Sequence, residues 1–174
     1  MGLFLIETTF NGEAPSKETI EEKVTQIQTN VDAVEASLIE VQISKDHTHA
    51  FFIVESANEA DATAAIEQAG ITVTLQKEVR LIGEQLEDVK QKKDVVNYLV
   101  EWNLPEHLTM DQYLARKQKN SVHYEEVPEV SFARTYVCED MTKCLCFYDA
   151  PDQAAVEKAR EAVQAPIDAI TELD

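Results

Sequence analysis

All three cysteines of the chain, Cys138, Cys144 and Cys146, lie in one short segment, YVCEDMTKCLCFYDAP. Thiolates bind soft metals and take part in redox chemistry. A structural zinc site takes four ligands, typically with a CxxC pair, which this segment lacks. If Val137 pairs with Cys144 across a four-residue turn, Cys144 and Cys146 share one face of the hairpin and Cys138 lies on the other. We therefore expect core cysteines that do not converge on a metal ion.

Two carboxylates recur at the same place in the two halves of the chain. Glu7 and Glu101 stand near the ends of the apolar stretches Leu3–Thr8 and Tyr98–Trp102. A carboxylate there could bind a cation or act as a general base, or it could bond backbone groups of the next turn. Both are candidate ligand-binding residues, and Glu101 is also a candidate metal ligand.

The histidines offer a second set of metal ligands. His47 and His49 form an HxH at the tip of a predicted hairpin, which could bind nickel, copper or zinc weakly, although a solvated turn is the preferred interpretation. The second half has Met141 and Lys143 at the corresponding positions. His107, in a loop before a predicted helix, is a further weak candidate that would act together with the carboxylate at the end of the preceding strand.

The elements that must position these residues occur twice, 94 positions apart. SLIEVQISKDHTHAFFIVESANEADATAAIEQAG (Ser37–Gly70) aligns without a gap on SFARTYVCEDMTKCLCFYDAPDQAAVEKAREAVQ (Ser131–Gln164). Each half predicts a strand, a helix, two strands around a tight turn, a second helix and a last strand. We expect one domain at 1–83, a polar linker at 84–95 and a second domain at 96–174.

The order βαββαβ is that of a ferredoxin-like domain, and it leaves one face of each four-stranded sheet uncovered. Two copies in one chain can cover each other. The predicted fold is therefore α+β, with two tandem ferredoxin-like domains that form an intramolecular dimeric α+β barrel, a pseudo-dimer.

Strand alternation assigns the hairpin residues to two faces. The helix-covered face is predicted to hold Ile39, Val41, Ile43, Ala50, Phe52 and Val54, with Ala133, Thr135, Val137, Cys144, Cys146 and Tyr148 as their counterparts. The opposite face, which includes Leu38 and Phe132, would line the space between the sheets. Its best candidates for a small-molecule pocket are Arg134 and Tyr136. Glu40 could form a buried pair with Arg134, and these polar groups could equally do no more than satisfy one another.

Composition narrows the class of partner. The formal net charge of −18 disfavours nucleic acid and anionic membranes as partners. No apolar run approaches the ~20 residues of a membrane span. An odd number of cysteines in a chain that shows no signal peptide favours reduced thiols and a cytoplasmic location. The expected partner is a small molecule or a metal ion, and the chain could be monomeric or associate further.

The second half resembles a small bacterial ferredoxin-like family that includes nickel-responsive, nickel-binding proteins. The residues that carry the resemblance are YLVEWNLP, RTYVCEDMTKCLCFYDAPDQAAVEKA and PIDAITEL, at 98–105, 134–159 and 166–173. The first half looks like a diverged copy. The resemblance implies single domains that pair into barrels, and nickel or another divalent transition metal as the cofactor to expect.

Two functions follow from these observations. The first is a non-enzymatic cytoplasmic binding protein that holds a nickel-like metal ion or a small ligand between two facing sheets. The alternative is a cofactor-independent, monooxygenase-like barrel enzyme that acts on a small aromatic compound, which rests on analogy of fold. The enzyme would need a polar residue such as Tyr136 to reach an open cavity.

Overall fold

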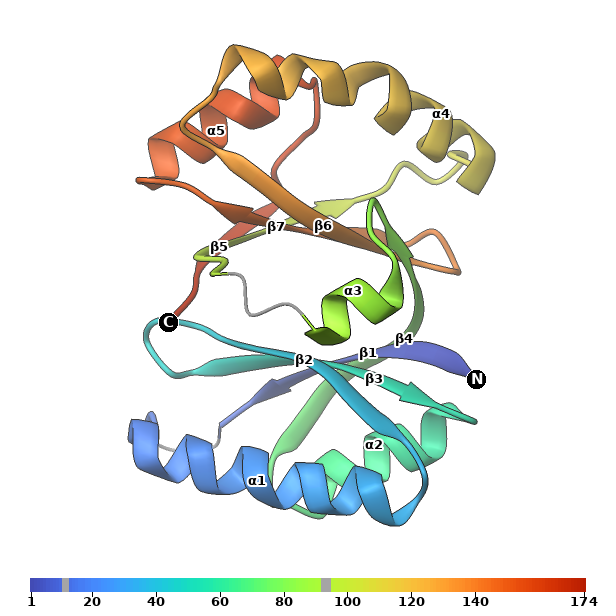
Figure 1. Cartoon of the computed structure of the whole chain (residues 1–174), viewed down its shortest axis with the longest axis vertical. Coiled ribbons are helices and arrows are strands. Elements are labelled where there is room, and N and C mark those ends of the chain that lie inside the picture. Colours follow the sequence, from blue (N-terminus) through green and yellow to red (C-terminus); the bar gives the residue numbers. More distant parts are fainter. Residues whose placement is uncertain (11–12, 92–94) are drawn as a thin grey trace. The chain divides into compact units, whose positions relative to one another are not determined.

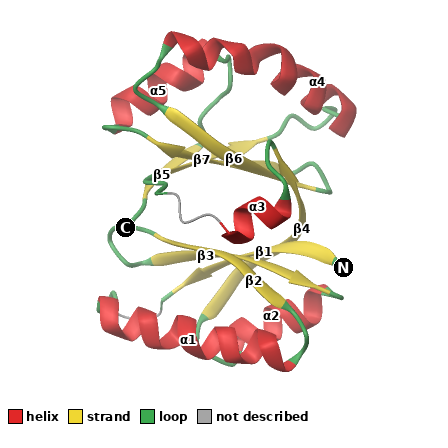
Figure 2. Cartoon of the chain, in the orientation of Figure 1, coloured by secondary structure: helices red, strands yellow, loops and turns green. Residues whose placement is uncertain are grey.

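A computed structural model describes residues 1–10, 13–91 and 95–174 of the chain. It divides into two compact units, one formed by Met1–Val79 together with Asp174 and the other by Arg80–Leu173. In each unit, two longer helices lie on one face of an antiparallel sheet (Figures 1 and 2). The predicted α+β class is thus confirmed. None of the described helices is long and apolar enough to cross a membrane.

The first unit has the predicted order βαββαβ. Its strands are arranged β2-β3-β1-β4, and the last residues of β4, from Arg80 onward, belong to the second unit. The elements are β1 (Gly2–Thr9), α1 (Lys17–Ala33), β2 (Ser37–Ile43), β3 (His49–Ser56), α2 (Glu59–Glu67) and β4 (Thr72–Ile82).

The second unit repeats this order and adds two short helices. Its strands are arranged β6-β7-β5-β8, and α3 lies in the segment that the sequence predicts as a linker. The elements are α3 (Leu86–Gln91), β5 (Tyr98–Asn103), α4 (Met110–Asn120), the 3-10 helix η1 (Ser121–Glu126), β6 (Ser131–Cys138), β7 (Lys143–Asp149), α5 (Gln153–Ala162) and β8 (Ala169–Glu172).

Side-chain caps fix where the helices begin. Ser16 accepts a hydrogen bond from the backbone N–H of Thr19 at the start of α1. Thr109 and Gln112 form a capping box at the start of α4, in which each side chain bonds the other residue's backbone N–H. These bonds satisfy N–H groups that have no partner within the helix.

The two hairpin turns have the same hydrogen bonds at positions 94 apart. Asp46 Oδ1 accepts from the backbone N–H and the hydroxyl of Thr48, at 3.1 and 2.7 Å. Asp140 Oδ1 accepts from the same two groups of Thr142, at 3.1 and 2.6 Å. Short-range bonding of this kind by Asp holds a turn in place. Both turns therefore close by local chemistry that the sequence alone encodes.

Backbone conformation recurs at the same interval. His47 and Met141 have φ values of 60° in the two turns, and Gly70 and Gln164 have φ values of 79° and 56° after the second helix of each unit. Residues other than glycine seldom adopt such values. Gln164 therefore holds a position that glycine holds in the first unit.

The hairpin registers match the prediction at the turns and depart from it further away. Val137 pairs with Cys144, as predicted, and Ile43 pairs with Ala50 at the corresponding place in the first unit. The expected placement of Leu38 and Phe132 on the face away from the helices is wrong.

β-bulges cause the departure. The register shifts between Leu38 and Glu40 in β2 and between Phe132 and Arg134 in β6. A bulge inserts one extra residue into a strand, so the residues before it change face. Leu38 and Phe132 consequently pack against the apolar clusters under the helices, whereas Ile39 and Ala133, predicted there, take no part in those clusters.

The turn at Asp46 leads to a prediction about pH. Hydrogen bonds from the Thr48 and Ser44 side chains lower the pKa of Asp46 to about 2. The carboxyl of Asp46 titrates near pH 4 in the unfolded chain, so its ionised form stabilises the folded protein. This stabilisation is complete above about pH 4 and is lost as the pH falls toward 2. In urea unfolding, we expect Asp46→Ala to lower the free energy of unfolding at pH 7 by up to about 1 kcal/mol, since solvent screens exposed hydrogen bonds.

The difference between wild type and Asp46→Ala should shrink as the pH approaches 2. Glu22→Ala, an exposed change on α1, is the matched control, and its effect should not follow the same pH course. An Asp46→Ala effect that is constant from pH 2 to 7 would contradict the assignment.

Candidate functional site

The predicted pocket residues of the second unit lie in a closed environment. Arg134 is buried, and its Nη1 lies 3.3 Å from Oε1 of Glu84, which follows β4. Tyr136 is completely buried, and its ring meets Phe147 edge-on with centroids 6.0 Å apart. Arg134 is thus held by an ion pair within its own unit, and Tyr136 is packed against Phe147.

The three predicted carboxylates lie on strands. Glu40, in β2, accepts a hydrogen bond of 2.7 Å from Gln42 Nε2. Glu7, in β1, is partly exposed. Glu101, in β5, lies 2.7 Å from Lys143 Nζ on the neighbouring strand β7, and both side chains are mostly buried. A cation could bind Glu101 only by competing with this lysine.

The predicted metal-binding histidines make bonds of other kinds. His47 Nδ1 lies 3.1 Å from the Pro15 carbonyl and Nε2 lies 2.7 Å from Asp174 Oδ2, and the bond to Asp174 raises the pKa of His47. His49 Nδ1 lies 2.7 Å from the Thr48 hydroxyl. His107 is exposed in the loop before α4. Within residues 1–10, 13–91 and 95–174, no three His, Cys, Asp or Glu side chains come together to hold a metal ion.

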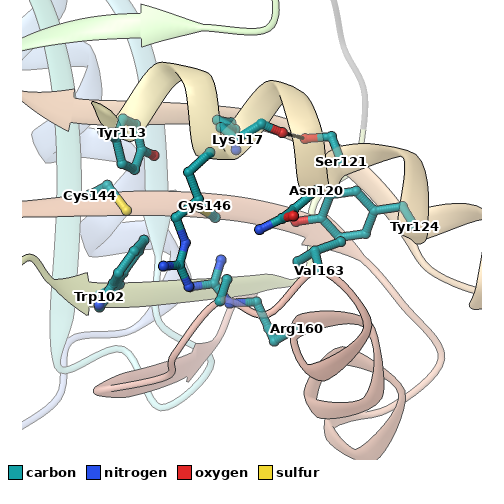
Figure 3. Close-up of a pocket in the computed structure, with 12 residues that line it drawn as sticks. Trp102, Tyr113, Lys117, Asn120, Ser121, Tyr124, Cys144, Cys146, Arg160 and Val163 are labelled. Atoms are coloured by element: carbon teal, nitrogen blue, oxygen red, sulfur yellow. Dashed lines mark hydrogen bonds between the residues drawn. The ribbon is translucent and has the colours of Figure 1, made fainter. Parts of the chain in front are cut away.

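Sequence reasoning missed a pocket on the helix side of the second unit (Figure 3). Its walls come from α4 and η1, from β5 and β7, and from α5 and the loop after it, and its volume is about 30 Å³. Such a volume holds roughly two water-sized groups. The pocket therefore suits a very small ligand.

Arg160 is the central polar group of this pocket. It is 2% exposed although it carries a charge. Its Nη1 donates to Tyr148 Oη at 3.0 Å and its Nη2 donates to the Pro166 carbonyl, whereas its Nε has no hydrogen-bond partner among the described residues. Burial raises the pKa of Tyr148 above its usual range and that of Tyr124 to about 12. Both phenols are therefore neutral at physiological pH.

The two tyrosines extend this polar chain. Tyr124 Oη, from η1, lies 2.7 Å from Tyr148 Oη, from β7. Phe132 stacks on Tyr124 with ring centroids 5.3 Å apart and an interplanar angle of 7°. The bulge that brings Phe132 to the helix side thus also supports the tyrosine pair.

Cys144 and Cys146 are buried free thiols, which confirms that they belong to the core. They also line the pocket, where Thr135 donates to Cys146 Sγ at 3.2 Å. The hydrogen bond from Cys144, followed by the charges of Lys117 and Arg160, lowers the pKa of Cys146. The same bond and burial raise the pKa of Cys144.

Two further cations line the pocket from α4. The guanidinium of Arg116 lies 5.4 Å from the centroid of the Trp102 ring, and Lys117 Nζ lies 4.4 Å from that of Phe132. Cations over aromatic faces are held there electrostatically. The sequence signal was the run ARKQK in α4, a basic stretch in an acidic chain, which could have indicated this site.

The first unit has apolar side chains at three of the equivalent positions. The residues 94 positions before Arg160, Tyr148 and Cys146 are Ile66, Val54 and Phe52, all completely buried. The polar pocket is therefore a feature of the second unit and not of the fold.

The bond between Tyr148 and Arg160 can be tested by removing one oxygen atom. Tyr148→Phe should lower the free energy of unfolding by about 1–3 kcal/mol, because it leaves both a buried guanidinium donor and the Tyr124 hydroxyl without their partner. Urea unfolding followed by the fluorescence of Trp102, which lies in the second unit, measures this effect. Tyr124→Phe keeps the Tyr148–Arg160 bond and should cost less. Equal costs for the two variants would contradict the central role of Arg160.

Comparisons with known proteins agree on the fold. No curated protein matches the sequence. The fold is similar to that of TA0507, named as a candidate chlorite dismutase, with a TM-score of 0.62, 12% identity and coverage of 100% of this chain and 95% of that one. It is also similar to a candidate monooxygenase of Lactobacillus acidophilus NCFM, with a TM-score of 0.51, 11% identity and coverage of 100% and 94%.

A third structure with this fold is a candidate monooxygenase (FN1347) of Fusobacterium nucleatum subsp. nucleatum ATCC 25586, with a TM-score of 0.52, 12% identity and coverage of 99% and 90%. At these identities the likeness concerns the fold alone. A match to a family model comes from the sequence of the second half. Residues 98–173 match the family described as nickel responsive protein SCO4226-like, which confirms the resemblance predicted for this half of the chain.

Proposed function

We propose that this chain is a non-enzymatic, cytoplasmic binding protein that holds one small ligand in the helix-side pocket of its second unit. The observation that carries the proposal is Arg160, a buried charge with an unpartnered Nε among the described residues, which lines a small pocket. Pockets with a few convergent polar groups are where small ligands bind. The free thiols of the core suit a reducing compartment.

The chemistry of the pocket favours binding over acid–base catalysis. A general base works best with a pKa near the working pH. Tyr124 and Tyr148 have pKa values raised by burial, and no histidine or carboxylate is found among the described residues of the lining. The pocket thus offers donors and fixed positive charge but no histidine or carboxylate base.

The monooxygenase-like alternative rests on fold. Two solved structures with this fold are named as candidate monooxygenases. An enzyme of this kind that used Tyr136 would need its hydroxyl to reach a cavity, and Tyr136 is completely buried. The enzyme is therefore the second candidate.

Nickel remains the metal to test, because residues 98–173 match a nickel-responsive family. The predicted ligand Glu101 is already paired with Lys143. A nickel ion at Glu101 would have to displace the Lys143 ammonium, and His107 would have to approach from its exposed loop. We rank this site below the pocket.

A variant that fills the pocket tests the proposal. Wild type, Asn120→Phe and Lys119→Phe are compared by thermal shift and by Trp102 fluorescence, against small anionic, neutral and cationic compounds and against nickel, zinc and copper ions. Asn120 lines the pocket and the adjacent Lys119 is exposed and does not. We expect at least one compound to stabilise wild type and Lys119→Phe but not Asn120→Phe.

Two results would contradict the proposal. One is a compound response that is the same in Asn120→Phe and wild type. The other is sub-micromolar, near-stoichiometric metal binding that is lost in Glu101→Ala or His107→Ala, since it would place the function at the predicted metal ligands instead.

A further inference from the structure

We infer that the ligand of the helix-side pocket is a small monovalent oxyanion of carboxylate size, bound by the guanidinium groups of Arg160 and Arg116. This inference rests on the proposed function and names the class of ligand. It follows from the charge of the pocket, from the Nε of Arg160, which has no hydrogen-bond partner among the described residues, and from the size of the space.

The charge of the pocket is opposite to that of the chain. The sequence has 33 acidic residues against 15 lysines and arginines. Among the described residues that line the pocket, three are cations, Arg116, Lys117 and Arg160, and none is a carboxylate. Positive groups gathered in a partly enclosed site concentrate anions there. The acidic residues elsewhere on the protein repel anions, so anions should bind at this pocket in preference to the rest of the surface.

Arg160 lacks the partner that a buried charge needs. Its two bonded nitrogens donate to neutral oxygens, the hydroxyl of Tyr148 and the carbonyl of Pro166. Among the described residues no carboxylate pairs with it, and its Nε is unpartnered. Buried charges are normally paired, because an isolated charge in a low-dielectric interior is costly. Figure 3 shows Arg160 extending from α5 toward the other side chains of the lining.

Arg116 supplies a second guanidinium with donors to spare. It donates through Nη2 to the Gln164 carbonyl and lies over the Trp102 ring. A guanidinium has five N–H donors in a plane, a geometry that matches a carboxylate. The carbonyls that hold the two arginines, of Gln164 and Pro166, both belong to the loop after α5. One loop therefore positions both guanidinium groups at the pocket.

The volume limits the size of the anion. About 30 Å³ accommodates roughly two water-sized groups. Formate, which has three heavy atoms, suits this space, whereas the tetrahedral sulfate ion has five and would require the walls to move. The expected order of affinity is therefore formate above sulfate, the reverse of what charge alone would give.

Cys146 is the internal competitor for the role of anion. Its thiol lines the same pocket, and the charges of Lys117 and Arg160 help to lower its pKa. A thiolate there would partly neutralise the arginines. The pocket still has a volume of about 30 Å³, and Arg116 has donors beyond the Nη2 that bonds Gln164, so we favour an added anion over the thiolate. The Cys146→Ala variant separates these two possibilities.

The single tryptophan of the chain, Trp102, lines the pocket and reports on it directly. Its fluorescence is followed while sodium formate is added to the full-length protein at constant ionic strength, with gluconate as the bulky balancing anion and sulfate as the second probe. We expect a saturable change with formate and a weaker one with sulfate.

Charge-removing variants locate the site. Arg116→Met should raise the formate dissociation constant about tenfold, the effect of losing one charged hydrogen bond. Arg160→Lys, which keeps a charge but loses the planar donors, should also weaken binding. Lys119→Met removes an exposed charge from the same helix outside the pocket, and its formate affinity should equal that of wild type. Arg116 is exposed, so its variant remains informative if changes at Arg160 prevent folding.

Five results would overturn the inference. A linear, unsaturable response, or equal formate affinity in wild type and Arg116→Met, would reduce the effect to screening. A response seen only in Cys146→Ala would identify the thiolate as the charge partner. A pocket that binds neutral compounds, with loss in Asn120→Phe, but not formate would preserve the proposed function and reject the anion, whereas no binding of any compound would reject both.

Discussion

The buried guanidinium of Arg160 is the constraint on which the helix side of the second unit depends. A charge that is 2% exposed must be compensated by hydrogen bonds, or it would cost several kcal/mol. Tyr148 on β7 and the Pro166 carbonyl supply two of these bonds. Tyr124 then bonds Tyr148, and Phe132 stacks on Tyr124. Residues of η1, of the bulged strand β6 and of the loop after α5 thus all take part in the contacts around this charge.

The two units show that the fold does not require this arrangement. The first unit has the buried apolar residues Ile66, Val54 and Phe52 at the places equivalent to Arg160, Tyr148 and Cys146. An apolar core of similar volume is usually at least as stable as a buried polar network. The polar residues of the second unit are thus costly to stability, and such costs are typical of sites that bind something.

The family match suggests a metal ion as the ligand, whereas the geometry of the described residues suggests an anion. The match of residues 98–173 concerns a nickel-responsive family, whereas the pocket in that span carries positive charge, which disfavours a metal cation. The carboxylate best placed by the sequence for a metal, Glu101, is paired with Lys143. Response to a metal and binding of an anion are separate properties, and the variants at Glu101 and Arg116 address them separately.

The sequence by itself determined the class of fold and much of its local structure. The capping box at Thr109, the turns at Asp46 and Asp140 and the pairing of Val137 with Cys144 depend on residues close in the chain, so their patterns are readable. Only the tertiary structure decided which side Phe132 faces and that Arg160 is buried. A β-bulge interrupts the alternation of faces at a position that the sequence pattern does not mark. The burial of Arg160 depends on packing between α5, η1 and β7, which come from distant parts of the chain.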